Sequence, residues 1–159
     1  MVFNLVQSKL EEQHFRIVDK DHNRPWGGFF VIAEEQSQRF ADVFFDGLDV
    51  SSLRISGKLS PKILIVAPTK RLSWQYHHRR AEIWRVIQGQ AGVVRSNTDY
   101  ENEIEILNVG ATVTLLQGER HRLVGLEDYS VVAEIWQHTY ADNPSDENDI
   151  VRLQDDFGR

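Results

Sequence analysis

One short stretch carries most of the side chains that could do chemistry. Residues 72–84 alternate apolar and polar side chains, pass through two arginines and become apolar again. Because side chains on a strand alternate between its two faces, Gln75 and His77 are predicted to share one face. Glu82 follows on the next predicted strand, so the three donors would converge from two neighbouring strands. Oxygen and nitrogen donors that face inward together predict a metal site.

The elements around this stretch are mostly short predicted strands. Residues 62–67 are predicted to form a strand that is continuously apolar after Lys62, which is typical of a strand covered on both faces. Short strands separated by turn residues predict a β sandwich or barrel with mostly antiparallel pairing. The predicted strands cover residues 14–19, 29–33, 62–67, 71–78, 82–88, 91–96, 103–107, 111–116, 121–124 and 129–137.

Two segments before Pro61 have helical spacing instead. Apolar residues three and four positions apart predict an amphipathic helix over 2–12 and a helical segment over 34–48. Between them, residues 21–28 have the composition of a turn, in which Gly27 or Gly28 takes a positive φ or allows a close backbone approach. Residues 49–60 and 141–148 are predicted to be loops, and residues 149–159 a charged tail.

Length and composition predict one domain of 159 residues, with an N-terminal arm and helical insertion (1–60), a barrel (61–140) and a tail (141–159). The net charge of -6 argues against nucleic acid or an anionic membrane surface as a partner. The absence of cysteine excludes disulfide and thiolate chemistry. With no apolar run near the roughly 20 residues of a membrane span and no secretory signal pattern, a cytoplasmic protein is expected.

A second group of residues completes a pattern of a known fold family. Residues 75–89 resemble the first cupin motif, HxHxxxxE followed by six residues and a glycine, with Gln75 in place of the first histidine. Residues 110–121 resemble the second motif, with Leu116 in place of a proline. The resemblance implies a mainly β, antiparallel barrel of the jelly-roll type that holds one divalent metal, for which Zn, Mn, Fe, Ni and Co all remain open. The implied ligands are Gln75, His77, Glu82 and His121. The alternative is a set of polar residues in a barrel mouth without metal.

Further motifs narrow the resemblance to the type II mannose-6-phosphate isomerases. The segments 24–27, 72–89 and 148–159 occur in the same order as in that group, where glutamine in the first ligand position is characteristic. These isomerases often form the C-terminal domain of bifunctional isomerase/guanylyltransferases. No nucleotidyltransferase domain is expected within these 159 residues, so that second activity is not implied. Some residues differ from those usual in the group, among them Trp136 and His138. These differences bear on which substrate is bound and not on the fold.

The resemblance implies a metal-dependent isomerase of a sugar phosphate, either a hexose or a heptose. Interconversion of aldose and ketose moves a proton between C1 and C2 through a cis-enediol, which requires a base and a Lewis acid. Glu82, Lys62 and Glu134 are alternatives for the base. Phosphate recognition requires fixed cations, and Arg80 is the first candidate because it lies beside the ligands. The candidate catalytic residues are Glu82, Lys62, Arg80 and Glu134, and the candidate substrate-binding residues are Arg80, Arg24, Lys62 and Arg159.

Other functions stay open because cupins host many activities. A non-catalytic cupin could bind a sugar phosphate or nucleotide sugar without turnover, and other metal-dependent reactions such as epimerisation are a third class. His78 has the opposite strand parity from His77 and is predicted to point away from the cavity. Trp26 and Trp84 are predicted to form core or cavity wall. Apolar residues of the N-terminal segment favour a homodimer, and a small-molecule sugar phosphate is the expected partner.

Overall fold

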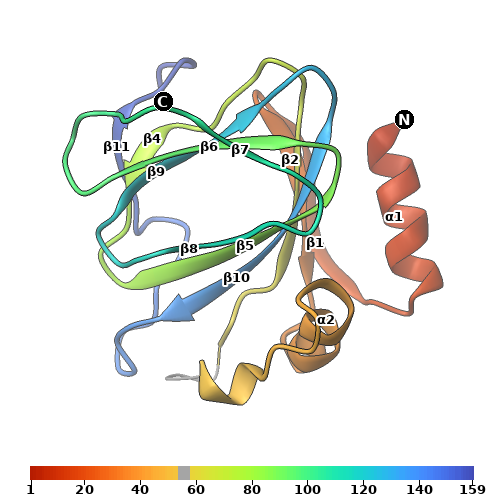
Figure 1. Cartoon of the computed structure of the whole chain (residues 1–159). Coiled ribbons are helices and arrows are strands. Elements are labelled where there is room, and N and C mark those ends of the chain that lie inside the picture. The colour runs from red at the N-terminus through yellow and green to blue at the C-terminus, as the bar shows by residue number, and fades with distance from the viewer. Residues whose placement is uncertain (54–57) are drawn as a thin grey trace.

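The computed structural model describes residues 1–53 and 58–159 and consists of two antiparallel β sheets that face each other. Two helices lie outside the larger sheet (Figure 1). This is the predicted cupin barrel, and every strand pairing in the described residues is antiparallel. No helix within the described ranges is long and apolar enough to cross a membrane.

The six-stranded sheet has the order β1-β2-β3-β10-β5-β8, and the five-stranded sheet has the order β11-β4-β9-β6-β7. The first sheet contains β1 (Ile17–Arg24), β2 (Gly27–Ile32), β3 (Lys62–Val66), β5 (Arg80–Gln88), β8 (Thr112–Leu115) and β10 (Ser130–His138). The second contains β4 (Trp74–Tyr76), β6 (Ala91–Ser96), β7 (Glu105–Leu107), β9 (Arg120–Gly125) and β11 (Val151–Gln154). The helical elements are α1 (Val2–Glu12), α2 (Ser37–Phe44) and the 3-10 turns η1 (Glu34–Gln36) and η2 (Val50–Ser52).

Two hydrophobic clusters cover the two faces of the larger sheet. Successive residues of β3 belong to different clusters. Ile63 and Ile65 pack under the helices, whereas Leu64 and Val66 pack between the sheets. The prediction that this strand is covered on both faces is therefore confirmed. The same period of two applies along β10, where Val132 lies between the sheets. Glu134, two positions on, shares that inner face.

The predicted turn over residues 21–28 is shorter in the structure. Strand β1 continues to Arg24, and only Pro25 and Trp26 separate it from β2. Gly27 has φ of 143°, and a Cβ at that position would lie 2.0 Å from the backbone oxygen of Ile65. The prediction of positive φ and close backbone approach is thus confirmed at Gly27, where any side chain would collide with β3.

Three other predicted boundaries differ. The helical segment 34–48 is a 3-10 turn followed by α2, which ends at Phe44. The loop 49–60 contains the turn η2, and its residues 54–57 lie outside the described residues. The tail 149–159 contains strand β11, which pairs with β4 at the edge of the smaller sheet. This strand has only 4 residues and lies within a tail that is otherwise rich in charge, so it was not distinguished from that tail.

Candidate metal centre and cavity

His77, Glu82 and His121 meet between the two sheets. The expectation that their strands are neighbours is wrong, because β4 pairs with β9 and β11, whereas β5 pairs with β10 and β8. The segment after His77 crosses from the smaller sheet to the larger one instead of closing a hairpin. Glu82 therefore faces the histidines from the opposite sheet, and the donors converge because both sheets direct inward-facing side chains into one interior.

The three side chains form a compact and buried group. Glu82 Oε1 lies 2.8 Å from His121 Nε2 and 3.3 Å from His77 Nε2. Their candidate ligand atoms all lie within 4.8 Å of one another. Each of the three side chains is at most 3% exposed. Two imidazoles and one carboxylate with an open position make up a common catalytic metal site.

Backbone carbonyls set the orientation of both imidazoles. His77 Nδ1 lies 2.7 Å from the carbonyl oxygen of Asp149, and His121 Nδ1 lies 2.9 Å from that of Glu119. A carbonyl only accepts, so each Nδ1 carries the proton and each Nε2 of the neutral ring presents a lone pair. An Arg80 guanidinium nitrogen 3.4 Å from His77 Nε2 agrees with this assignment, because arginine only donates.

The charges and lone pairs of the group fit a divalent cation. Burial lowers the pKa of His77 and favours the neutral ring. Burial alone would raise the pKa of Glu82, but the positive charge of the adjacent Arg80 guanidinium helps to hold that pKa well below its usual range. Glu82 Oε1 and His121 Nε2 have no hydrogen-bond partner in the described structure, although they are close together. A cation between these atoms would remove their repulsion and satisfy both.

Gln75 lies beside this group but has a different contact. It pairs directly with His121 across β4 and β9, so both side chains face the interior. Its Oε1 accepts a hydrogen bond from Ser73 Oγ at 2.6 Å. An amide oxygen retains a second lone pair, and Gln75 as fourth ligand stays a prediction. His78 is exposed and stacks edge-on against Tyr76, which confirms that it points away from the site.

A cavity of about 490 Å³ opens onto Gln75 and Glu82. Its volume is in the range of small-molecule sites. Trp26 forms part of its wall, as expected, whereas Trp84 is buried in the core beneath it. The cavity brings together all four predicted substrate-binding residues and one additional cation; the five are Arg24, Lys62, Arg80, Arg152 and Arg159.

The structure assigns Arg80 a different environment from the one expected. One terminal nitrogen donates to Ser145 Oγ and to the Asp146 carbonyl, both at 2.9 Å, and Nε approaches Glu82 at 3.4 Å. Its guanidinium also lies 3.6 Å from the Trp136 ring centroid. Most of its donors are therefore used within the protein, and Arg80 is better placed to position Glu82 than to bind a phosphate.

The other cavity cations differ in their partners. Arg24 pairs with Asp21 at 3.1 Å, and Arg159 donates to both carboxylate oxygens of Asp155. Lys62 pairs with Glu147. Arg152 has no ion-pair partner among the residues that the structure describes. Lys62 and Arg152 are thus the cavity cations with the least committed charge, since Glu147 itself is largely exposed.

Glu134 lies inside the cavity between two tryptophans. Its carboxylate oxygens accept from the indole nitrogens of Trp84 at 2.7 Å and Trp136 at 2.8 Å. Burial, reinforced by the charge of Glu82, raises the pKa of Glu134 to about 7. A carboxyl group with that pKa can both accept and return a proton at neutral pH. Trp136, one of the departures from the family pattern, faces the cavity and orients this carboxylate.

Asp149 was not recognised from the sequence as a site residue. Its carboxylate accepts the backbone N–H groups of His78 and Arg79, each at 2.9 Å, and the hydroxyl of Ser145 at 2.6 Å. Its own carbonyl orients His77. It therefore fixes the corner where the chain crosses between the sheets. Only its place in the C-terminal motif run marked it, because His78 and Arg79 lie about 70 positions away in the sequence.

The buried ring of His138 should make the stability of the protein depend on pH. Ser145 N–H donates to its Nδ1 at 2.9 Å, which fixes a neutral ring. Burial, together with nearby Lys58 and Arg80, lowers the pKa of His138 from 6.5 to about 4. Between these pH values the unfolded chain binds a proton that the native ring does not, so the free energy of unfolding should decrease as pH falls from 6.5 to 4. Urea unfolding between pH 7 and about 4.5 should show a weaker decrease in His138→Gln.

The matched control for this measurement is His78→Gln, which removes an exposed imidazole. It should retain the slope of the parent protein. Equal slopes in the parent and His138→Gln would contradict the assignment of a buried neutral imidazole.

The sequence matches one family model and parts of several longer proteins. Residues 34–155 match the family described as mannose-6-phosphate isomerase C-terminal. Mannose-1-phosphate guanylyltransferase from Salmonella montevideo is 27% identical over 156 residues, which cover 95% of this chain and 26% of that protein. Xanthan biosynthesis protein XanB from Xanthomonas campestris pv. campestris (strain B100) is 30% identical over 137 residues, covering 86% and 23%. The chain thus spans about a quarter of the length of these relatives.

One solved structure supports the fold across most of the chain. The capsular polysaccharide assembling protein CapF from Staphylococcus aureus has a TM-score of 0.55 at 15% identity. The match covers 88% of this chain and 34% of that chain. At this identity the similarity concerns the arrangement of strands and not the activity.

Proposed function

Because the chain belongs to the mannose-6-phosphate isomerase C-terminal family, we propose that it is a metal-dependent isomerase that interconverts aldose and ketose sugar phosphates. The observation that carries the proposal is Glu134, a carboxyl group with a pKa of about 7 in the cavity that also borders Glu82. The guanylyltransferase named among the relatives is about four times as long, and its activity is not part of the proposal.

The chain's own residues would divide the work as follows. His77, Glu82 and His121 would hold a divalent metal, with Gln75 as a fourth ligand. When bound, the metal would supply Lewis acidity toward the sugar oxygens. Glu134 would take the proton from one sugar carbon and return it to the next.

The choice of Glu134 follows from the states of the other two candidate bases. Glu82 has a strongly lowered pKa and a contact with Arg80, so it is a weak base committed to metal binding. Lys62 forms an ion pair with Glu147, so its Nζ is already engaged as a donor rather than free to take a proton. Glu134 directly opposes Lys62 across β10 and β3, so a phosphosugar bound by Lys62 would lie beside the base.

A turnover assay tests the proposal. Purified protein supplied in turn with Mn, Zn, Co, Ni or Fe(II) is expected to convert mannose 6-phosphate to fructose 6-phosphate, with a heptose phosphate as the second substrate to try. No turnover of any hexose or heptose phosphate by metal-loaded protein would refute the isomerase. Saturable binding of a sugar phosphate without turnover would instead favour the non-catalytic cupin. The expected homodimer is tested separately by light scattering, where a monomeric mass would contradict it.

A further inference from the structure

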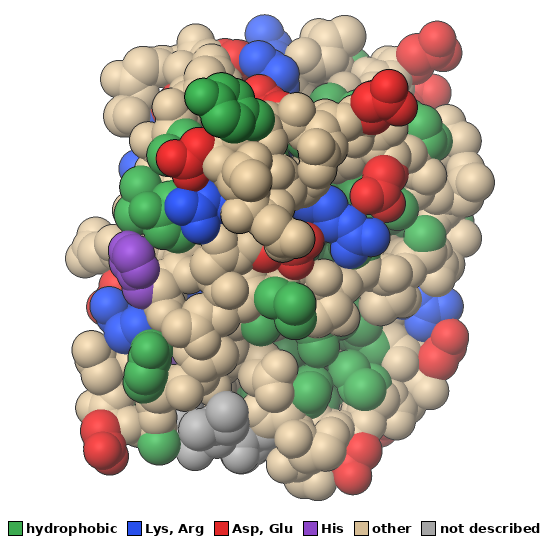
Figure 2. All heavy atoms as spheres, turned by 60° about the vertical axis from the view of Figure 1, so that its left-hand side comes forward, with side chains coloured by type: hydrophobic (Ala, Val, Ile, Leu, Met, Phe, Trp, Pro, Cys, Tyr) green, Lys and Arg blue, Asp and Glu red, His purple; other side chains and the backbone are tan. Residues whose placement is uncertain are grey.

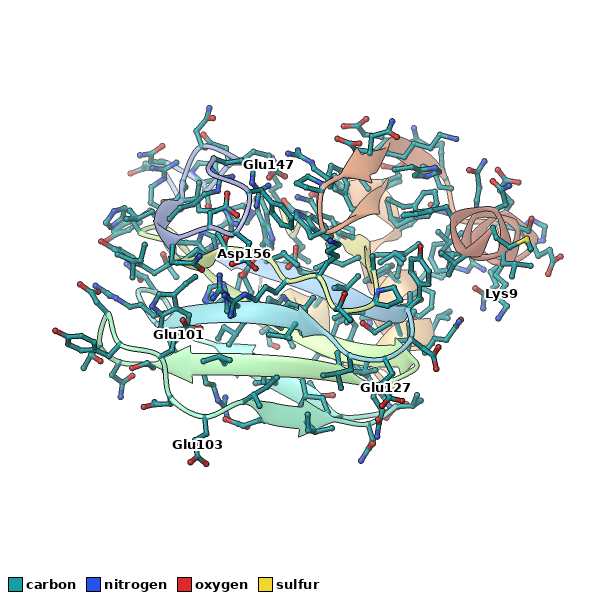
Figure 3. The ribbon with its side chains drawn as sticks, turned by 90° about the horizontal axis from the view of Figure 1, so that it is seen from above. Lys9, Glu101, Glu103, Glu127, Glu147 and Asp156 are labelled. Atoms are coloured by element: carbon teal, nitrogen blue, oxygen red, sulfur yellow. The ribbon has the colours of Figure 1, made fainter. Side chains whose placement is uncertain are left out.

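The ion pair between Lys62 and Glu147 lies at the edge of the cavity. Lys62 projects from β3 on the face shared with Leu64, and its side chain is only 8% exposed. Glu147 comes from the loop between β10 and β11, and its side chain is 67% exposed. Figure 3 shows Glu147 beside the loop that leads into β11. Both residues line the cavity.

The partners of the other paired cavity cations are less accessible. Asp155, which binds Arg159, and Glu82, which approaches Arg80, are each 3% exposed. Asp21, which binds Arg24, is 37% exposed. Returning a buried carboxylate to water requires rearrangement of the site, whereas Glu147 already lies mostly in water. Exposed carboxylates gain little from an ion pair, so Glu147 can be released at low cost.

Lys62 is in the opposite situation. A buried ammonium without an anion is strongly unfavourable, so Lys62 requires a negative partner whether or not a ligand is present. The Trp136 ring holds its Nζ at 4.1 Å from the ring centroid, which would keep the ammonium in place during an exchange of anions. Lys62 thus offers a prepared anion site whose present occupant is the most easily displaced one.

We propose that Glu147 is an exchangeable internal anion that occupies the phosphate position at Lys62 until substrate displaces it. The inference rests on the proposed function, because it assigns the phosphate of the sugar to Lys62. A phosphate dianion forms more charge-assisted hydrogen bonds than a carboxylate and would displace Glu147 into solvent. Neutral sugars cannot displace it, so this exchange would also discriminate against unphosphorylated sugars.

The consequence is that Glu147 competes with phosphate. Replacing it by glutamine removes the competing charge and leaves the exposed loop position otherwise unchanged. We expect inorganic phosphate to bind Glu147→Gln about 3–10-fold more tightly than it binds the parent protein. This is the change in affinity that corresponds to the free energy of a partly exposed ion pair. If the protein turns over a sugar phosphate, KM should fall without a loss of kcat.

The test is a calorimetric titration of metal-free protein with inorganic phosphate at fixed, low ionic strength. The matched control is Glu103→Gln, which changes net charge equally at an exposed position that Figure 3 shows on the opposite side of the sheets. It should change the affinity by less than about 2-fold, because separated surface charges are screened. Lys62→Met should lose phosphate binding with or without Glu147. Melting curves of each variant check that it is folded.

Equal or weaker phosphate binding by Glu147→Gln than by Glu103→Gln would overturn the exchange. So would unchanged binding by Lys62→Met. The titration requires no turnover, so an inactive protein that shows the expected gain would refute the isomerase alone. Active protein without the gain would refute the exchange alone.

Discussion

Replacing Glu134 by glutamine is expected to lower kcat by about 10²–10⁴-fold, the usual contribution of a positioned general base. The variant keeps the size of the side chain but cannot accept a proton at neutral pH. Metal content should remain that of the parent protein, because Glu134 is not one of the three converging donors. Measuring turnover and metal content on the same samples separates loss of the base from loss of the metal.

The pH profile supplies a second readout for Glu134. Its pKa of about 7 means that the base becomes protonated as pH falls through 7, so the parent kcat/KM should decrease on the acid side. Trp136→Phe removes one hydrogen bond that favours the carboxylate and should move this limb to higher pH. The residual kcat/KM of Glu134→Gln should not show this decrease on the acid side.

Glu127→Gln is the control for a change of one exposed carboxylate, and it should have parent activity. Glutamine at 134 provides only one acceptor oxygen for two indole N–H groups, so a loss of stability of about 1–3 kcal/mol is expected. Assays well below the melting temperature keep this effect out of kcat. Parent-like turnover by folded Glu134→Gln would exclude it as the base.

The sequence predicted the faces of strands better than their neighbours. A period of two placed Gln75 and His77 together, and motif spacing added Glu82 and His121, because those patterns are local. The side chains come from two opposed sheets, however, and alternation along one strand contains no information about which strand lies opposite. The metal-site residues were therefore expected to meet through a hairpin that does not exist.

Contacts made by the C-terminal segment were the least predictable. Residues 141–148 contain Ser145 and Glu147, whose sequence context is that of an ordinary polar loop. Their roles depend on where the loop returns to the barrel: Ser145 meets Arg80 and Glu147 meets Lys62. Similarly, Arg80 was expected to face a phosphate, because the carbonyl and hydroxyl that occupy its donors lie 65 or more positions away.

His121→Ala should abolish the stabilisation of the protein by divalent metal. A ligand that binds only the native state at 100 times its Kd adds about 2.7 kcal/mol, which corresponds to a rise in Tm of about 5–10 °C for a chain of this length. The parent protein should show that rise with at least one of Zn, Mn, Fe(II), Ni and Co. Loss of one of three converging donors should weaken binding by more than about 100-fold, since even the groups that orient ligands contribute 10–100-fold.

His78→Ala is the matched control, because it removes the same side chain only one position from His77 but on the exposed side of the strand. It should retain the full metal-dependent rise in Tm. Without metal, His121→Ala creates a cavity but also relieves the repulsion between Nε2 and Glu82 Oε1, which lie 2.8 Å apart without a hydrogen bond. Its metal-free Tm should therefore fall by less than burial of the ring alone predicts. A parent protein whose Tm responds to none of the five metals would contradict the site. An equal metal response in the two variants would remove His121 from it.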